Sequence, residues 1–279
     1  MISVVTNVAS LQAQRNLNKS TSSLQTSIER LSSGLRINRA GDDAARLAIS
    51  EQIRSNLKGL KQAERNANDN ISLIQTAEGA LNEVTGVVSR MRELAVQASN
   101  EGTMDTTQRG YLNQEFTLLQ SELDRIVNVT EYNGQKLVDG TISGGTGTLD
   151  FQVGMNNSAN DRISMSIQNT STTGLGINDE SLATSSQAQA AITALDTALQ
   201  TVNTERSTLG ATQNRLEMTL SNLGNMYENL STADSRLRDA DIAEEAAAMS
   251  RAQILNQAGT SVLAQANQIP QSALSLIGG

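Results

Sequence analysis

Adjacent carboxylates are the residues of this sequence whose type and spacing come nearest to a catalytic pair. The two pairs are Asp42–Asp43 and Glu244–Glu245. Two carboxylates that face one substrate can share general acid and base work. Neighbouring positions on a helix point in different directions, so neither pair aims both groups at one substrate. We therefore interpret both pairs as helix caps or solvated surface.

The rest of the side-chain chemistry is narrow. The 279 residues include 29 acidic residues but no His and no Cys. Zinc sites built on thiolate or imidazole, Ser-His-Asp and Cys-His nucleophiles, and disulfides are therefore excluded. The EF-hand loop pattern and the phosphate-binding GxxxxGK[ST] pattern are also missing. We find no active site, expect neither an enzyme nor a cofactor, and expect the function to lie in surfaces.

The charge distribution restricts the partners. A net charge of −8 argues against nucleic acid and against a membrane surface. Residues 1–39 hold five basic residues and one acidic residue, net +4, whereas residues 228–245 hold six acidic and two basic residues, net −4. Two interpretations stay open: the ends attract each other within or between chains, or both are solvated faces.

The first residues lack the basic start and the apolar stretch of a secretory signal peptide. No apolar run approaches the roughly 18 residues of a membrane span. We therefore expect the protein to stay in the cytosol or to leave it by a route that does not read such a signal.

Apolar residues at alternating spacings of three and four predict three long helices, over about 44–100, 105–129 and 188–238. The last of these carries a heptad series of Leu and Val at 195, 202, 209, 216, 223, 230 and 237. A heptad repeat of this length is typical of a coiled coil or a long bundle helix. The single proline, Pro270, lies outside all three ranges.

A different pattern occupies residues 130–187. Asn133-Gly134 and Asp139-Gly140 are turn signals, and apolar residues alternate over 149–153 and 163–167. We expect two short strands there. The predicted fold is mainly α: an elongated bundle or coiled coil of long helices with a small β region at one end.

Both ends of the chain are amphipathic strips, over residues 1–35 and 246–279. Each has an apolar face with no partner in the sequence except the other end. Isolated strips of this kind are marginal as helices. We expect them to become ordered when they pair or assemble.

Six segments resemble blocks of bacterial flagellin. They are LSSGLRINRAGDDAA at 31–45, IQTAEGAL at 74–81, RMRELAVQ at 90–97, TEYNGQKL at 130–137, LGATQNRL at 209–216 and LAQANQIP at 263–270. The blocks are long and lie in both halves of the chain. Arg46 stands where the family often has Gly. The middle of the chain is too short to hold the large outer domains of many flagellins, so the resemblance is to a short form.

The resemblance implies a structural subunit that polymerises into the filament for swimming motility. Residues 1–40 and 242–279 would be the two halves of an inner coiled-coil domain, and residues 41–241 an outer rod domain. It also implies export through the flagellum's own channel to a position outside the cell. The implied partners are further copies of the chain, an export chaperone, and the filament cap and hook-associated proteins.

Two sets of residues correspond to the family's contact surfaces. The apolar positions expected in the inner core are Val4, Val8, Leu11, Leu24, Ile28, Leu31, Leu35, Leu255, Val262, Leu263 and Ile269. We expect Ile254, Leu255, Val262, Leu263 and Ile269 to contact the chaperone, as apolar anchors at helical spacing do.

In flagellins the second set is both a subunit contact and the patch bound by the animal Toll-like receptor. Its residues here are Arg90, Glu93, Leu94, Gln97 and Glu115. The heptad assignment turns Leu94 away from the bundle seam, towards solvent.

Two alternatives to a filament flagellin fit the sequence less well. A hook–filament junction protein shares the terminal segments with flagellin, but the blocks at 74–97 and 130–137 argue against it. An enzymatic flagellin with a metalloprotease domain requires His-Glu-x-x-His, which a chain without His cannot supply.

Overall fold

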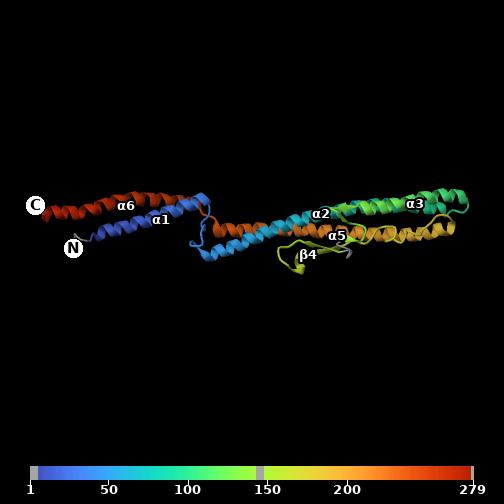
Figure 1. The fold of residues 1–279 in the computed structure, drawn as a ribbon, viewed down its shortest axis with the longest axis horizontal. Helices are drawn as coiled ribbons and strands as arrows, with labels where there is room; N and C mark the ends of the chain where they lie inside the picture. Colours follow the sequence, from blue (N-terminus) through green and yellow to red (C-terminus); the bar gives the residue numbers. More distant parts are fainter. Residues whose placement is uncertain (1–5, 143–147, 278–279) are drawn as a thin grey trace. The chain divides into compact units, whose positions relative to one another are not determined.

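The structure, a computed structural model, describes residues 6–142 and 148–277, with only the backbone for 269–277. It confirms a mainly α fold with small antiparallel sheets (Figure 1). The helices are α1 (Val8–Ser33), α2 (Ala44–Ala98), α3 (Thr106–Val129), α5 (Ser185–Arg238) and α6 (Ile242–Ile277). The chain divides into two compact units, an end unit of Met1–Leu57 with Asn229–Gly279, and a middle unit of Lys58–Glu228.

The long helices begin where polar side chains cap them. Asp43, the residue before α2, accepts a hydrogen bond from the backbone N–H of Arg46 in the first turn of that helix (3.0 Å). Asp105 caps α3 by accepting from the Gln108 N–H (2.7 Å), and the Gln108 side chain accepts in return from the Asp105 N–H. Such caps satisfy amides that a helix leaves unpaired. The helix starts predicted at residues 44, 105 and 188 lie within three residues of the starts of α2, α3 and α5.

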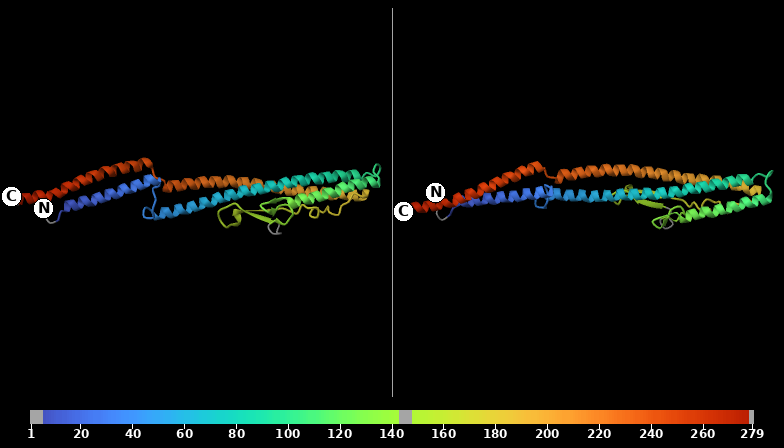
Figure 2. Two further views of the ribbon diagram at one scale, coloured as in Figure 1. Left: turned by 45° about the horizontal axis from the view of Figure 1, so that its top comes forward. Right: turned by 90° about the horizontal axis from the view of Figure 1, so that it is seen from above.

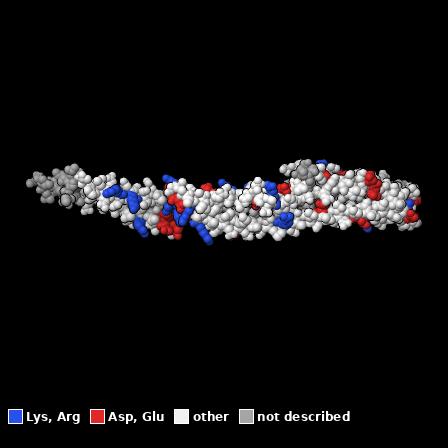
Figure 3. All heavy atoms as spheres, turned by 90° about the horizontal axis from the view of Figure 1, so that it is seen from below, with Lys and Arg blue, Asp and Glu red and all other residues white. Residues whose placement is uncertain are grey.

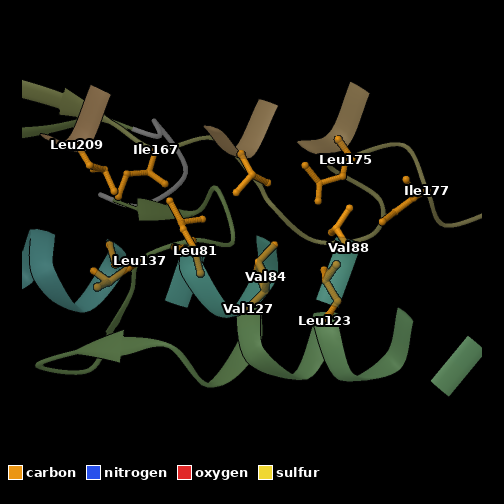
Figure 4. Close-up of a cluster of buried hydrophobic side chains, with 14 of the residues drawn as sticks. Leu81, Val84, Val88, Leu123, Val127, Leu137, Ile167, Leu175, Ile177 and Leu209 are labelled. Carbon is orange, nitrogen blue, oxygen red and sulfur yellow. The ribbon is translucent and has the colours of Figure 1, made fainter. Parts of the chain in front are cut away.

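The core of the middle unit lies between α2, α3 and α5. Figure 4 shows Leu81, Val84 and Val88 of α2 near Leu123 and Val127 of α3. The heptad residues of α5 are buried from 195 to 223 and half-buried at 230 and 237. The predicted seam is thus fully buried in the middle unit and half-buried at its two positions in the end unit.

Two hairpins follow α3. β1 (Glu131–Tyr132) pairs with β2 (Gln135–Lys136) across Asn133-Gly134, whose positive φ angles of 52° and 76° suit a tight hairpin turn. β3 (Thr148–Gln152) pairs antiparallel with β4 (Arg162–Ser166), with Phe151 opposite Ile163. These ranges confirm the two predicted strands.

A strap without regular structure, residues 167–184, closes the core. Its Ile167, Leu175, Ile177 and Leu182 are at most 8% exposed. Three side chains of α3 hold it: Asp124 accepts from the Thr172 N–H (2.8 Å), Gln120 donates to the Ile177 carbonyl (2.7 Å), and Asn113 accepts from the Leu182 N–H (2.7 Å). Positions 113, 120 and 124 share one helix face, so α3 presents a polar row to the strap.

In the end unit, α1 and α6 lie side by side in all the ribbon views (Figures 1 and 2). The linkers that follow α1 and precede α6 also meet. Leu35 and Asp239 form an antiparallel bridge, and the Ala240 N–H donates to the Gly34 carbonyl (3.0 Å). Gly34 adopts a φ of 72°, which ends α1 at low cost because glycine has no Cβ. The ends therefore have a partner within the chain.

Candidate subunit interface

Small residues line the seam between α1 and α6. Ala13 of α1 and both Ala252 and Ala266 of α6 are buried. At Gly259, an added Cβ would lie 3.1 Å from Cδ1 of Leu17, so the missing side chain allows close approach. The seam is narrow because its central side chains are small.

Polar contacts fix the register of this seam. Asn7 donates from Nδ2 to the Ala266 carbonyl (2.7 Å), and Ser20 donates from Oγ to the Ala252 carbonyl (3.1 Å). Nearer the linkers, Arg30 Nη1 lies 2.7 Å from Oε1 of Glu245. This ion pair joins the basic N-terminal region to the acidic C-terminal one, so for these two residues the attraction acts within the chain.

Next to the linkers, further polar contacts join the start of α2 to the end of α5. Arg238 is 8% exposed and donates from Nη1 to Glu51 (3.0 Å), and Ser50 donates to Asp234 (2.5 Å). The backbone N–H groups of Arg39 and Asn38 hold the pKa of Asp42 below its usual value. Asp42 and Asp43 therefore serve as turn and helix caps, as the sequence predicts.

The residues expected in the inner core fall into two groups. Leu24, Leu31, Leu35 and Leu263 are half-buried. The others keep between 48% and 60% of their surface exposed: Val8, Leu11, Ile28, Leu255 and Val262. Val4 lies outside the described residues, and so does the side chain of Ile269. Ile254, expected at the chaperone contact, is 66% exposed.

The end unit thus presents large aliphatic side chains to solvent although its own seam is small and polar. Charged side chains of both signs gather on part of the face that Figure 3 views. The exposed aliphatic side chains of the end unit, rather than its charged ones, make a surface of the kind typical of a protein–protein contact.

In the middle unit, Arg90 organises the second predicted patch. Its Nη2 lies 2.9 Å from Oε1 of Glu115, and its Nη1 lies 2.9 Å from Oε2 of Glu93. Because Arg90 donates these hydrogen bonds, the carboxylate of Glu115, and then that of Glu93, raises the pKa of Arg90. Gln97 is exposed on the same helix. The patch therefore bridges α2 and α3.

The expectation that Leu94 faces solvent is wrong, because Leu94 is 1% exposed and belongs to the core. Met91, Ala95 and Ala98 are buried beside it. The heptad assignment gave α2 one seam, whereas α3 and α5 both pack on α2 and bury a wider arc. The sequence signal for this arc was the run of apolar residues at 91, 94, 95 and 98, at one-face helical spacing.

Neither a metal centre nor a membrane span is found in the part of the chain that the structure describes. Within 6–142 and 148–277, no three acidic side chains gather as a cation site would require. No helix in those ranges combines the length and the apolar character needed to cross a bilayer.

Comparison with known families places the chain. Residues 4–143 match the family model described as the bacterial flagellin N-terminal helical region, and residues 192–277 match that of the bacterial flagellin C-terminal helical region.

Curated relatives agree along nearly the whole chain. A flagellin of Halalkalibacterium halodurans is 48% identical over 271 residues, covering 97% of this chain and 98% of the relative. A Bacillus subtilis flagellin is 45% identical with the same coverage, and a flagellar filament 33 kDa core protein of Treponema phagedenis is 42% identical. Because these relatives match over 98% of their own length, the short form without large outer domains fits.

Solved structures share the fold. The crystal structure of Bacillus cereus flagellin is 33% identical, with a TM-score of 0.50 over 57% of this chain and 88% of that one. A putative flagellar hook-associated protein from Vibrio parahaemolyticus gives a TM-score of 0.58 over 71% of this chain and 100% of its own, but at 13% identity this shows the fold alone. On these matches, the chain belongs to the bacterial flagellin family.

Proposed function

We propose that this flagellin is a filament subunit whose exposed aliphatic residues on α1 and α6 form the inner contacts between copies. The family and the relatives at 42–48% identity support a filament subunit. The hook-associated alternative has less support, since its structural likeness has only 13% sequence identity.

One observation carries the assignment to α1 and α6. Val8, Leu11, Leu255 and Val262 stay at least half exposed after the two helices have paired. Fully burying a side chain of this size is worth about 1.5–3 kcal/mol. Several such residues on each copy supply a driving force for assembly that the isolated subunit leaves unused.

The same proposal assigns the domains. Residues 1–40 and 242–279 form the inner coiled-coil domain of the filament, and residues 41–241 form its outer rod. In support, α1 and α6 pair with each other and are joined at the linkers by the Leu35–Asp239 bridge. The α1–α6 pair can therefore act as one element.

Membership of the family and the exposed side chains of α6 also support partners outside the polymer. The chain leaves the cell through the flagellar channel, and an export chaperone covers Ile254, Leu255 and Val262, which are exposed on α6. Filament cap and hook-associated proteins contact the subunits at the two ends of the polymer. The exposed aliphatic side chains of α6 support a chaperone contact, because an uncovered apolar surface promotes aggregation before the subunit assembles.

The animal Toll-like receptor for flagellin binds the patch of Arg90, Glu93, Gln97 and Glu115, with Leu94 supporting it from the core. The free subunit presents these polar side chains to solvent. Arg90→Glu should weaken receptor binding by the monomer and leave its melting temperature close to that of the parent chain. Equal affinities for the variant and the parent chain would remove the patch from the proposal.

Assembly is tested with charge placed on the exposed face of α6. The variant Leu255→Asp with Val262→Asp should keep the helical circular dichroism of the parent chain and stay in the supernatant when seeded with filament fragments. Gln253→Asp with Gln257→Asp adds the same charge to the same helix at exposed polar positions and should still polymerise. Filament yield from the first variant equal to that from the control would contradict the proposal.

A further inference from the structure

The Asn-Gly step at 133–134 has no part in the proposed contacts between subunits. It is the only such step in the chain, and both residues are exposed at the tip of the β1–β2 hairpin. The backbone nitrogen of a glycine is open to approach, because glycine has no Cβ. In Asn133-Gly134 this nitrogen can attack the side-chain amide that precedes it, so the step is a candidate site of spontaneous deamidation.

This reaction needs no enzyme and takes only water as a co-reactant. The Gly134 nitrogen forms a bond to Cγ of Asn133, the bond from Cγ to Nδ2 breaks, and Nδ2 leaves as ammonia with the proton of the Gly134 nitrogen. Water then opens the five-membered imide at one of its two carbonyls. Opening at Cγ gives aspartate. Opening at the backbone carbonyl gives isoaspartate, in which the main chain runs through the side chain and is longer by one atom.

The folded turn prevents the first step. Asn133 and Gly134 have φ angles of 52° and 76°, and a two-residue hairpin loop with two positive φ angles is a type I′ turn. In this turn the ψ angle of the first residue is about +30°. Since Cα is tetrahedral, that ψ angle puts the Gly134 nitrogen and Cβ of Asn133 on opposite sides of the Cα–C bond. The imide therefore cannot close until the turn opens.

Contacts on both sides of the turn keep it closed. Tyr132 packs against the core of the middle unit, and Leu137 and Val138 are fully buried. The Leu137 N–H donates to the Thr130 carbonyl (3.2 Å), and the Val138 carbonyl accepts from both the N–H and Oγ1 of Thr170 (3.0 Å each). Opening the turn disturbs these contacts, so the open form is a minor state of the folded chain.

The two products differ in how well they suit the turn. The strands pair Glu131 with Lys136 and Tyr132 with Gln135, which leaves two residues for the loop. Loop length fixes the register of a hairpin, so one additional main-chain atom breaks this pairing. Aspartate keeps the normal main chain, and type I′ turns accept Asp before Gly. Isoaspartate is therefore the product that damages the hairpin.

We infer that Asn133-Gly134 is a modification site that folding switches off. The unfolded chain deamidates itself at Asn133, and the folded hairpin prevents the reaction. Isoaspartate at this position thus records how long a chain stayed unfolded, and a chain that carries it loses the β1–β2 pairing. The inference concerns the single chain and does not depend on the proposed function.

Mass spectrometry of the full-length chain tests the effect of folding. The chain is kept in native buffer and in unfolding urea at one mildly alkaline pH and one temperature, and the tryptic peptide 126–136 is then analysed. Conversion of Asn133 should be about a hundredfold slower in native buffer, because only the open fraction reacts. Asn128, in the same peptide, is followed by the branched Val129 and should stay unconverted in both buffers. Equal rates at Asn133 would overturn the inference.

Two variants separate the longer main chain from the added charge. Asn133→Asp carries the charge on a normal main chain, and Asn133→Gly keeps a Gly-Gly type I′ turn that cannot deamidate. Each chain is incubated in urea and refolded, and amide hydrogen exchange is measured at Leu137. The parent chain should show a fast-exchanging fraction equal to its isoaspartate content at 133, as labelled by protein isoaspartyl methyltransferase. Neither variant should show one beyond its own, smaller isoaspartate content. Isoaspartyl chains that exchange at Leu137 as slowly as unmodified ones would overturn the claimed loss of the hairpin.

Discussion

Arg90 of α2 and Glu115 of α3 are joined by a 2.9 Å ion pair, and Leu94, one turn along α2 from Arg90, is buried in the core. The exposed ion pair and the buried leucine thus belong to one junction between α2 and α3, but they have different roles. The charged residues give the junction its surface chemistry, while Leu94 fills the space between the helices.

Replacing Leu94 should therefore damage the fold. Leu94→Ala removes buried methyl groups and leaves a cavity, so we expect a loss of about 2–5 kcal/mol in the free energy of unfolding, measured in urea. Gln97→Ala, at an exposed position on the same helix, should change it by less than about 0.5 kcal/mol. Similar losses from the two variants would mean that Leu94 is not in the core.

The strap should depend on Asn113. Asn113→Ala leaves the buried Leu182 N–H without its acceptor, which costs about 1–3 kcal/mol. The rate of amide hydrogen exchange at Leu182 should rise by the factor that this loss of free energy corresponds to. Asn128→Ala, at an exposed position on the same helix, serves as the control, and unchanged exchange at Leu182 in the Asn113 variant would refute the role given to Asn113.

Glu205 should make stability depend on pH. It is 7% exposed on α5, and burial raises its pKa although the Gln168 N–H opposes the shift. The folded state then holds this proton more tightly than the unfolded state, so the contribution to stability is present below the unfolded pKa and is lost as the pH rises through the raised value. Relative to Glu205→Gln, the parent chain should lose stability as the pH rises above about 4.5. A difference that stays constant between pH 4 and pH 8 would contradict this.

Chaperone binding should separate two leucines of α6. Leu255 is 53% exposed, whereas Leu263 is half-buried in the end unit. Leu255→Asp should weaken capture by the export chaperone and leave the circular dichroism of the chain intact. Leu263→Asp should weaken capture and also loosen the pairing of α1 with α6. Capture of both variants as strong as that of the parent chain would rule out this helix as the chaperone's target.

The helices and the longer hairpin could be predicted because their signals are local. The heptad residues of α5 and the alternation around Phe151 and Ile163 depend only on spacing along the chain. The strap could not be predicted in this way. Leu175, Ile177 and Leu182 are buried but follow no period along the chain. Polar side chains of α3 hold the backbone at Ile177 and Leu182.

The sequence predicted which segments carry the assembly surfaces, but not which of their side chains are buried within the single chain and which stay exposed. The apolar spacing of residues 1–35 and 246–279 indicated two faces that need cover. It did not indicate that Ala13, Ala252 and Gly259 would form the intrachain seam and leave Leu11 and Leu255 outside it. Small residues carry little weight in a hydrophobic pattern, although they decide how closely two helices approach.

The central claim is that the aliphatic side chains left exposed on α1 and α6 become the contacts between subunits. A reconstruction by electron cryomicroscopy of the filament that this chain forms, at a resolution that shows side chains, tests it most directly. The account predicts that Leu11 and Leu255, 51% and 53% exposed in the single chain, are buried against neighbouring copies. A filament in which both side chains still face solvent would contradict it.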